Sequence, residues 1–135
     1  MRSISYKLFG NPVSHSLSPQ IHTLFAQQFD LTLSYTTQKV ETEDFLNALE
    51  QFRIQGGRGA NITVPLKEIA YTLCQHKSTQ AQRAQAVNTL YWDKDNQLCG
   101  DNTDGIGLVK DLKNNYHQIL ENKNILILGA GGAAR

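Results

Sequence analysis

Short runs of β-branched and aromatic residues alternate along this chain with segments whose apolar residues recur at helical spacing. The β-like runs cover residues 6–9, 31–40, 60–64, 86–92, 97–99 and 124–128. The helical patterns between them begin near Ser18, Thr42, Leu66, Ser78 and Asp104. Because strands that alternate with helices form layered structures, the order predicts an α/β protein with a mostly parallel, mixed sheet and helices on both faces.

Local signals within these segments predict how the helices begin and which sides they bury. Ser18 is expected to cap its helix, and Pro19 suits the first helical position because its missing N–H leaves no unpaired donor. The apolar residues at helical spacing are expected to face the interior. They are Ile21, Leu24, Phe25 and Phe29 in the first helix, Phe45, Leu49 and Phe52 in the second, and Val109, Leu112 and Tyr116 in the last.

Composition and charge are those of an ordinary globular protein and place few limits on function. The formal net charge of +1 over 135 residues gives no argument for a nucleic-acid or membrane partner. Cys74 and Cys99 form no C-x-x-C pair and have no histidine cluster nearby, so we expect reduced thiols and no metal site. The first residues lack the apolar stretch of a signal peptide, which favours a cytoplasmic location.

A glycine-rich segment follows the apolar run at 124–128. The segment fits the pattern G-x-G-x-x-A with Gly129, Ala130, Gly131, Gly132, Ala133 and Ala134. In dinucleotide-binding domains such glycines allow a tight turn and a close approach of the backbone to a pyrophosphate. The run and the loop therefore predict the first strand and phosphate loop of an incomplete Rossmann domain, with an ordinary glycine-rich turn as the alternative.

Polar residues gather where the predicted strands and turns end. They lie in four segments, at residues 14–19, 61–67, 86–89 and 100–105. Hydroxyls and amides suit a polyhydroxylated ligand, and Lys67 with Asp104 adds the possibility of proton transfer. The alternatives are structural: Ser18 as a helix cap, Asn102 and Asp104 as turn residues, and Lys67 as a solvated lysine.

These segments together resemble the motifs of the shikimate dehydrogenases, in the same order. The matching segments are Gly10-Asn11-Pro12-x-x-His15-Ser16-x-Ser18-Pro19, residues 59–67, Ala86-Val87-Asn88-Thr89, residues 100–105 and residues 129–133. The resemblance implies reduction of 3-dehydroshikimate to shikimate with NADPH, between a substrate domain and a Rossmann domain. It implies a shikimate-binding domain with a linker helix at residues 1–120, and the start of a truncated NADP-binding domain at residues 121–135.

The resemblance also implies roles for individual residues. Lys67 would be the catalytic acid and base, with Asp104 as its partner at the reacting oxygen. Ser16, Leu17 and Ser18 would hold the substrate carboxylate, while Thr63, Asn88, Asp104 and Lys67 would hold ring hydroxyls. Gly129, Ala130, Gly131, Gly132 and Ala133 would begin the NADP phosphate site.

Two positions depart from the family pattern, and several alternatives stay open. Gln85 replaces a glycine and Thr79 replaces a frequent glutamate, which weakens any expectation of cofactor contacts from that helix. The parent protein could instead be a quinate/shikimate dehydrogenase that uses NAD, or a shikimate-binding regulatory module without catalysis. We expect a polypeptide of these residues alone to be inactive, and a homodimer is possible. A helix end opposes and Asp104 favours the ammonium form of Lys67, and the sequence leaves the balance open.

Overall fold

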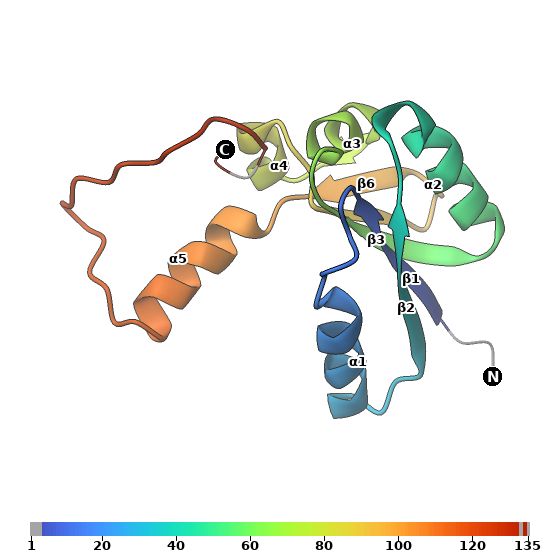
Figure 1. The fold of residues 1–135 in the computed structure, drawn as a ribbon, viewed down its shortest axis with the longest axis horizontal. Helices are drawn as coiled ribbons and strands as arrows, with labels where there is room; N and C mark the ends of the chain where they lie inside the picture. The colour runs from blue at the N-terminus through green and yellow to red at the C-terminus, as the bar shows by residue number, and fades with distance from the viewer. Residues whose placement is uncertain (1–3, 133, 135) are drawn as a thin grey trace.

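The computed structural model describes residues 4–132 and 134, which form one mixed sheet flanked by helices (Figure 1). The strands are β1 (Ile4–Gly10), β2 (Leu33–Lys39), β3 (Gly57–Ile62), β4 (His76–Lys77), β5 (Thr89–Trp92) and β6 (Leu98–Asp101). The helices are α1 (Ser18–Gln28), α2 (Phe45–Ile54), α3 (Lys67–Leu73), α4 (Thr79–Ala84) and α5 (Asp104–Asn114), and a 3-10 turn, η1 (Thr42–Asp44), precedes α2.

The sheet has the strand order β2-β1-β3-β5-β6-β4. β1 pairs in parallel with both β2 and β3, and β4 pairs in parallel with β6. β5 runs antiparallel to both of its neighbours, β3 and β6. This arrangement confirms the predicted mixed α/β sheet. The two-residue strand β4 was not predicted, because so short a run carries no periodic signal.

The main core lies between one face of the sheet and helices α2 and α3. Phe9 of β1 is fully buried there, and its ring meets Phe45 and Phe52 edge-on at centroid distances of 5.9 and 5.8 Å. Leu49 completes the buried side of α2, so the predicted inward face of this helix is confirmed. Burial of such large aromatic side chains is the main source of stability for a small domain.

Helix α1 covers the opposite face, so helices lie on both sides of the sheet as predicted (Figure 1). Successive strand residues point to opposite faces, and Leu8, Val13 and Tyr35 form a second, smaller cluster on this side. The expected buried side of α1 was wrong, because Ala26 is its buried residue and Phe29 is 72% exposed. α1 packs near the edge strand β2, which is too narrow a surface to cover the apolar side of the helix.

The segment after α5 also differs from the prediction. Residues 124–128 form no strand, and the side chains of residues 125–128 are between 63% and 87% exposed. A strand exists only through backbone pairing, and the described residues place no partner strand beside this segment. The expected buried side of α5 was also wrong, since Val109 and Tyr116 lie exposed and α5 has no buried residue. After α5 the chain turns back toward α4 (Figure 1).

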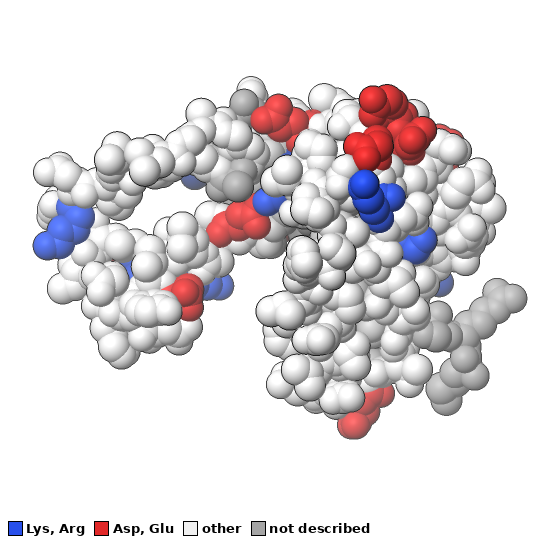
Figure 2. Space-filling view, in the orientation of Figure 1, with Lys and Arg blue, Asp and Glu red and all other residues white. Residues whose placement is uncertain are grey.

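Charge on the face shown in Figure 2 is mixed, with acidic side chains gathered at the top, where Figure 1 places the start of α2. Glu41, Glu43 and Asp44 all lie in this part of the chain. Among the described residues, the helices are too short or too polar to cross a lipid bilayer.

Candidate active site

Lys67 lies in the first turn of α3, in a loop-to-helix connection that follows β3. The Leu66 N–H donates to the Thr63 carbonyl oxygen at 2.9 Å, and the Leu66 side chain is fully buried, so this turn is anchored in the core. The Lys67 carbonyl accepts a hydrogen bond of 2.9 Å from the Val87 N–H. The Lys67 side chain is only 12% exposed, and its Nζ lies 2.6 Å from Asp104 Oδ2.

Asp104 is held by the buried side chain of Asn102. Asn102 Oδ1 accepts from the Asp104 N–H at 3.1 Å, while Asn102 Nδ2 donates to the Ala86 carbonyl oxygen at 3.1 Å. These two bonds tie the first residue of α5 to the loop before β5. The position of the Asp104 carboxylate therefore depends on an amide that lies inside the protein.

Asn88 completes this group. Its Nδ2 donates to Asp104 Oδ1 at 2.9 Å, so each carboxylate oxygen of Asp104 has a different donor. Asp104 takes one of the three N–H donors of the Lys67 ammonium, which leaves two directions for a ligand oxygen. The structure thus brings Lys67, Asn88 and Asp104, three predicted site residues from distant parts of the sequence, into one hydrogen-bonded group.

A second group of predicted residues lines a hollow beyond the ends of β1 and β3. Ser16, Ser18 and Thr63 surround a space of about 310 Å³ together with Leu8, Pro12 and His15. The Ser16 Oγ accepts from the Ser18 N–H at 3.1 Å. β1 and β3 are parallel, so their carboxyl ends bring these loops to the same edge of the sheet, where small ligands bind in α/β proteins.

One expectation about the start of α1 does not hold. The N-cap position is Leu17 rather than Ser18, and no side chain caps the helix. Leu17 is 62% exposed and is not among the residues that line the hollow, and its contact with a substrate stays a prediction.

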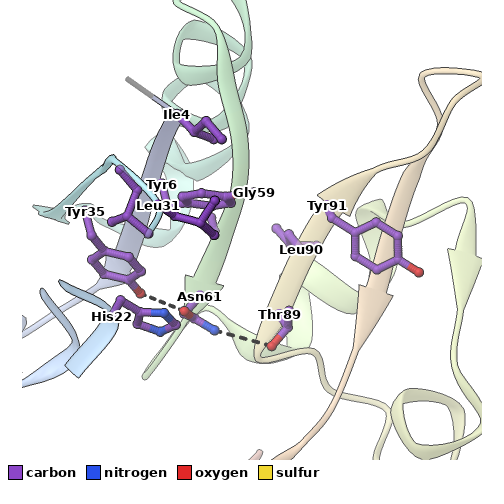
Figure 3. Close-up of a pocket in the computed structure, with 12 residues that line it drawn as sticks. Ile4, Tyr6, His22, Leu31, Tyr35, Gly59, Asn61, Thr89, Leu90 and Tyr91 are labelled. Carbon is purple, nitrogen blue, oxygen red and sulfur yellow. Dashed lines mark hydrogen bonds between the residues drawn. The ribbon is translucent and has the colours of Figure 1, made fainter. Parts of the chain in front are cut away.

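Sequence reasoning missed three residues behind the site: His22, Tyr35 and Asn61. The Tyr35 hydroxyl donates to Asn61 Oδ1 at 2.7 Å, and the His22 ring stacks on the Tyr35 ring at a centroid distance of 4.4 Å (Figure 3). Burial raises the pKa of Tyr35 to about 12, although the Ser18 side chain acts in the opposite direction. Asn61 lies in a polar segment that the sequence singled out, whereas His22 and Tyr35 gave no signal.

The glycine loop approaches Lys67. A Cβ on Gly132 would lie 3.3 Å from the Lys67 Cβ and 3.6 Å from the Ala86 Cβ, so the backbone at Gly132 packs against the base of the lysine. Gly129 adopts a φ of +118°, which favours glycine. Gly129, Ala130 and Gly131 are exposed, and Ala133 lies outside the described residues. The described residues contain no group of three His, Cys, Asp or Glu side chains that could hold a metal ion.

Residues 8–90 match the model of a known family, the shikimate dehydrogenase substrate binding domain. A shikimate dehydrogenase (NADP(+)) from Alcanivorax borkumensis is 54% identical over 130 residues, which cover 96% of this chain and 46% of that protein. The chain therefore spans about half the length of this relative.

Solved structures show the same similarity. An Ael1 enzyme from Pseudomonas putida is 42% identical, with a TM-score of 0.88 over 97% of this chain and 48% of that one. Shikimate 5-dehydrogenase from Thermus thermophilus, in complex with NADP(H) and shikimate, is 37% identical, with a TM-score of 0.86 over 97% of this chain and 49% of that one.

Proposed function

The chain belongs to the shikimate dehydrogenase family, as its substrate-binding domain, and on this premise we propose that it binds 3-dehydroshikimate for reduction to shikimate with NADPH. The observation that carries the proposal is the hydrogen-bonded group of Lys67, Asp104 and Asn88. It places one partly buried ammonium beside a carboxylate, with donors left over for a ligand oxygen.

Lys67 would act on the carbonyl oxygen of the substrate. Hydride addition to the carbonyl carbon leaves negative charge on this oxygen, and the Lys67 ammonium would supply the proton that turns it into a hydroxyl. In the oxidation of shikimate, the neutral amine would take the proton back. A cation held at this oxygen stabilises the transition state more than the ketone, because the charge exists mainly in the transition state.

The remaining polar residues would hold and orient the ring. Ser16 and Ser18 present hydroxyls near the start of α1, where a helix end favours an anion such as the substrate carboxylate. Thr63, Asn88 and Asp104 would bind ring hydroxyls. Thr63 lines the same hollow as Ser16 and Ser18, and it lies four residues before Lys67. One small cyclic acid would therefore reach the serines with its carboxylate and Lys67 with its carbonyl oxygen.

The exposed glycine loop would suit a dinucleotide phosphate, because Gly129 and Gly131 offer backbone without side chains. NADPH, when bound, would supply the hydride. Residues 129–133 would hold its phosphates, and the contact between Gly132 and Lys67 would keep the cofactor loop next to the reacting group. We propose that the reaction takes place in the cytoplasm.

A hybrid enzyme tests this proposal. The chain replaces the matching part of the Alcanivorax borkumensis shikimate dehydrogenase, and NADPH oxidation with 3-dehydroshikimate is measured. We expect turnover, and we expect Lys67→Ala to lower kcat by about 100- to 10,000-fold, as loss of a general acid does, with a much smaller change in KM. Lys110→Ala, a substitution of a lysine on the exposed part of α5, is the control.

Other outcomes separate the alternatives. Binding of shikimate by a hybrid that never turns over would contradict the enzymatic role and favour a binding module. Faster turnover of quinate than of shikimate by the hybrid would instead indicate a quinate/shikimate dehydrogenase. Unchanged kcat in the Lys67→Ala hybrid would remove Lys67 from the chemistry.

A further inference from the structure

A continuous line of hydrogen bonds runs from Tyr35, on the edge strand, to the Lys67–Asp104 pair. Tyr35 of β2 reaches across β1 to Asn61 of β3, which lies opposite Thr89 of β5 in the sheet register. Figure 3 shows these side chains at the base of an apolar groove, with the bonds from Tyr35 to Asn61 and from Asn61 to Thr89 drawn.

The direction of each bond follows from the chemistry of the groups. Asn61 Oδ1 can only accept, so the Tyr35 hydroxyl donates to it at 2.7 Å. The Asn61 Nδ2 then donates to the Thr89 Oγ1 and to the Asn88 carbonyl oxygen, both at 3.3 Å. Because the Thr89 oxygen accepts from Asn61, its single proton is directed elsewhere, to Asn88 Oδ1 at 2.9 Å.

The same reasoning fixes the orientation of the Asn88 amide. Its Oδ1 accepts from the Thr89 hydroxyl and from the Thr103 N–H, at 2.9 and 3.1 Å. The Nδ2 therefore faces Thr103 Oγ1 and Asp104 Oδ1, at 2.9 Å each. Since Asp104 Oδ1 is taken by Asn88, Asp104 Oδ2 is the oxygen that remains for Lys67.

We propose that Tyr35 and Thr89 are positioning residues, which act through Asn61 and Asn88 to hold Asp104 and Lys67 in the geometry that the reaction needs. The expected effect on catalysis rests on the proposed function, whereas the hydrogen bonds themselves do not depend on it. The His22 ring, stacked on Tyr35 with an angle of 7° between the planes, keeps the tyrosine directed at Asn61. Neither Tyr35 nor Thr89 is placed to touch the reacting atoms.

Each test substitution removes one hydroxyl from this line of hydrogen bonds, and each is paired with a control that leaves the line intact. Tyr35→Phe and Thr89→Val each remove one hydroxyl, and Val suits a strand position as well as Thr does. Tyr6→Phe is the control for Tyr35, because Tyr6 lies beside it in the register on the same face of the sheet. Thr89→Ser keeps the hydroxyl and should restore what Thr89→Val loses.

The first measurement uses the chain itself and needs no catalysis. In ¹⁵N NMR spectra we expect Tyr35→Phe and Thr89→Val to shift the side-chain amide signals of Asn88, and Tyr6→Phe and Thr89→Ser to leave them in place. Thermal unfolding followed by circular dichroism confirms that each variant is folded. Unshifted Asn88 signals in both folded variants would overturn the proposal.

The second measurement uses the hybrid enzyme. We expect Tyr35→Phe and Thr89→Val to lower kcat by about tenfold, the size of one hydrogen bond in the transition state, with little change in KM. Parental kcat in both variants would overturn the positioning role and leave the proposed function intact. If the unsubstituted hybrid shows no turnover, the proposed function fails, and the Asn88 signals still decide whether the hydrogen-bond line exists.

Discussion

Gly10 is the last residue of β1, and a side chain has no room there. A Cβ at this position would overlap the Thr63 methyl group and lie 3.0 Å from the Val64 carbonyl oxygen. We expect Gly10→Ala to displace Thr63, to lower the free energy of unfolding by about 1–3 kcal/mol, and to weaken shikimate binding. Urea unfolding and calorimetry measure the two effects, and Gly107→Ala, where a Cβ meets nothing within 4 Å, is the control.

His22 should make the stability of the domain depend on pH. Burial lowers the pKa of His22 below its usual 6.5, so the unfolded chain takes up a proton before the folded one as the pH falls. The free energy of unfolding should therefore decrease with acidification below about pH 6.5. The side chains placed against His22, those of Phe25, Tyr35 and Asn61, carry no charge in this range.

His22→Phe keeps a ring for the stack on Tyr35 and removes the titrating group. Chemical unfolding between pH 5 and 8 should then show a smaller slope of stability against pH than in the parent. The same substitution at exposed His117 is the control for the loss of one imidazole. An unchanged slope in the His22→Phe variant would contradict this assignment.

The sequence singled out the polar segments of the candidate site, but it could not predict how their side chains are held. Ser16, Thr63, Lys67, Asn88 and Asp104 stand in polar segments at strand ends, a pattern that chain order alone reveals. Their precise roles stay predictions. Tyr35 and His22 could not be found in this way, because neither belongs to a polar segment at a predicted strand end. Their contacts with Asn61 exist only in the folded sheet.

At the scale of single elements, helix α1 should contribute little to stability despite its apolar side. Phe29 is 72% exposed, whereas Phe52 of α2 is 2% exposed. We expect Phe29→Ala to change the free energy of unfolding by at most about 0.5 kcal/mol, and Phe52→Ala to lower it by about 3–5 kcal/mol. A large loss from Phe29→Ala would mean that another surface covers α1 in solution, such as a second copy of the chain.

Apolar spacing predicts the type of an element but not its partner. Apolar residues recur at helical spacing in both α1 and α2, yet of these two helices only α2 buries its large apolar side chains. The run at 124–128 is apolar enough for a strand and stays unpaired, since pairing depends on a neighbour that the run itself cannot specify. Sheet order and exposure are therefore the features of this fold that periodicity could not supply.

At the scale of the whole molecule, the residues predicted to bind the substrate are more completely arranged than those predicted to bind NADP. Lys67, Asn88 and Asp104 are already hydrogen-bonded to one another, and Ser16, Ser18 and Thr63 already line a hollow. The predicted cofactor site consists of the glycine loop at residues 129–133. Its first three residues are exposed, and Gly132 packs against the base of Lys67. Substrate binding and hydride transfer should consequently be separable in this chain.

A polypeptide limited to residues 1–135 should bind shikimate but not oxidise NADPH in the presence of 3-dehydroshikimate. Its hydroxyls and amides are held by the sheet edge, so binding needs no further order, whereas one glycine loop cannot fix a dinucleotide over the reacting carbon. Calorimetry with shikimate and the loss of NADPH absorbance measure the two properties on the same sample. Lys67→Ala should weaken the binding, since we expect the Lys67 ammonium to contact the ligand before any chemistry takes place. Steady NADPH oxidation by the unsubstituted polypeptide would contradict this separation and require a cofactor site that these residues do not display.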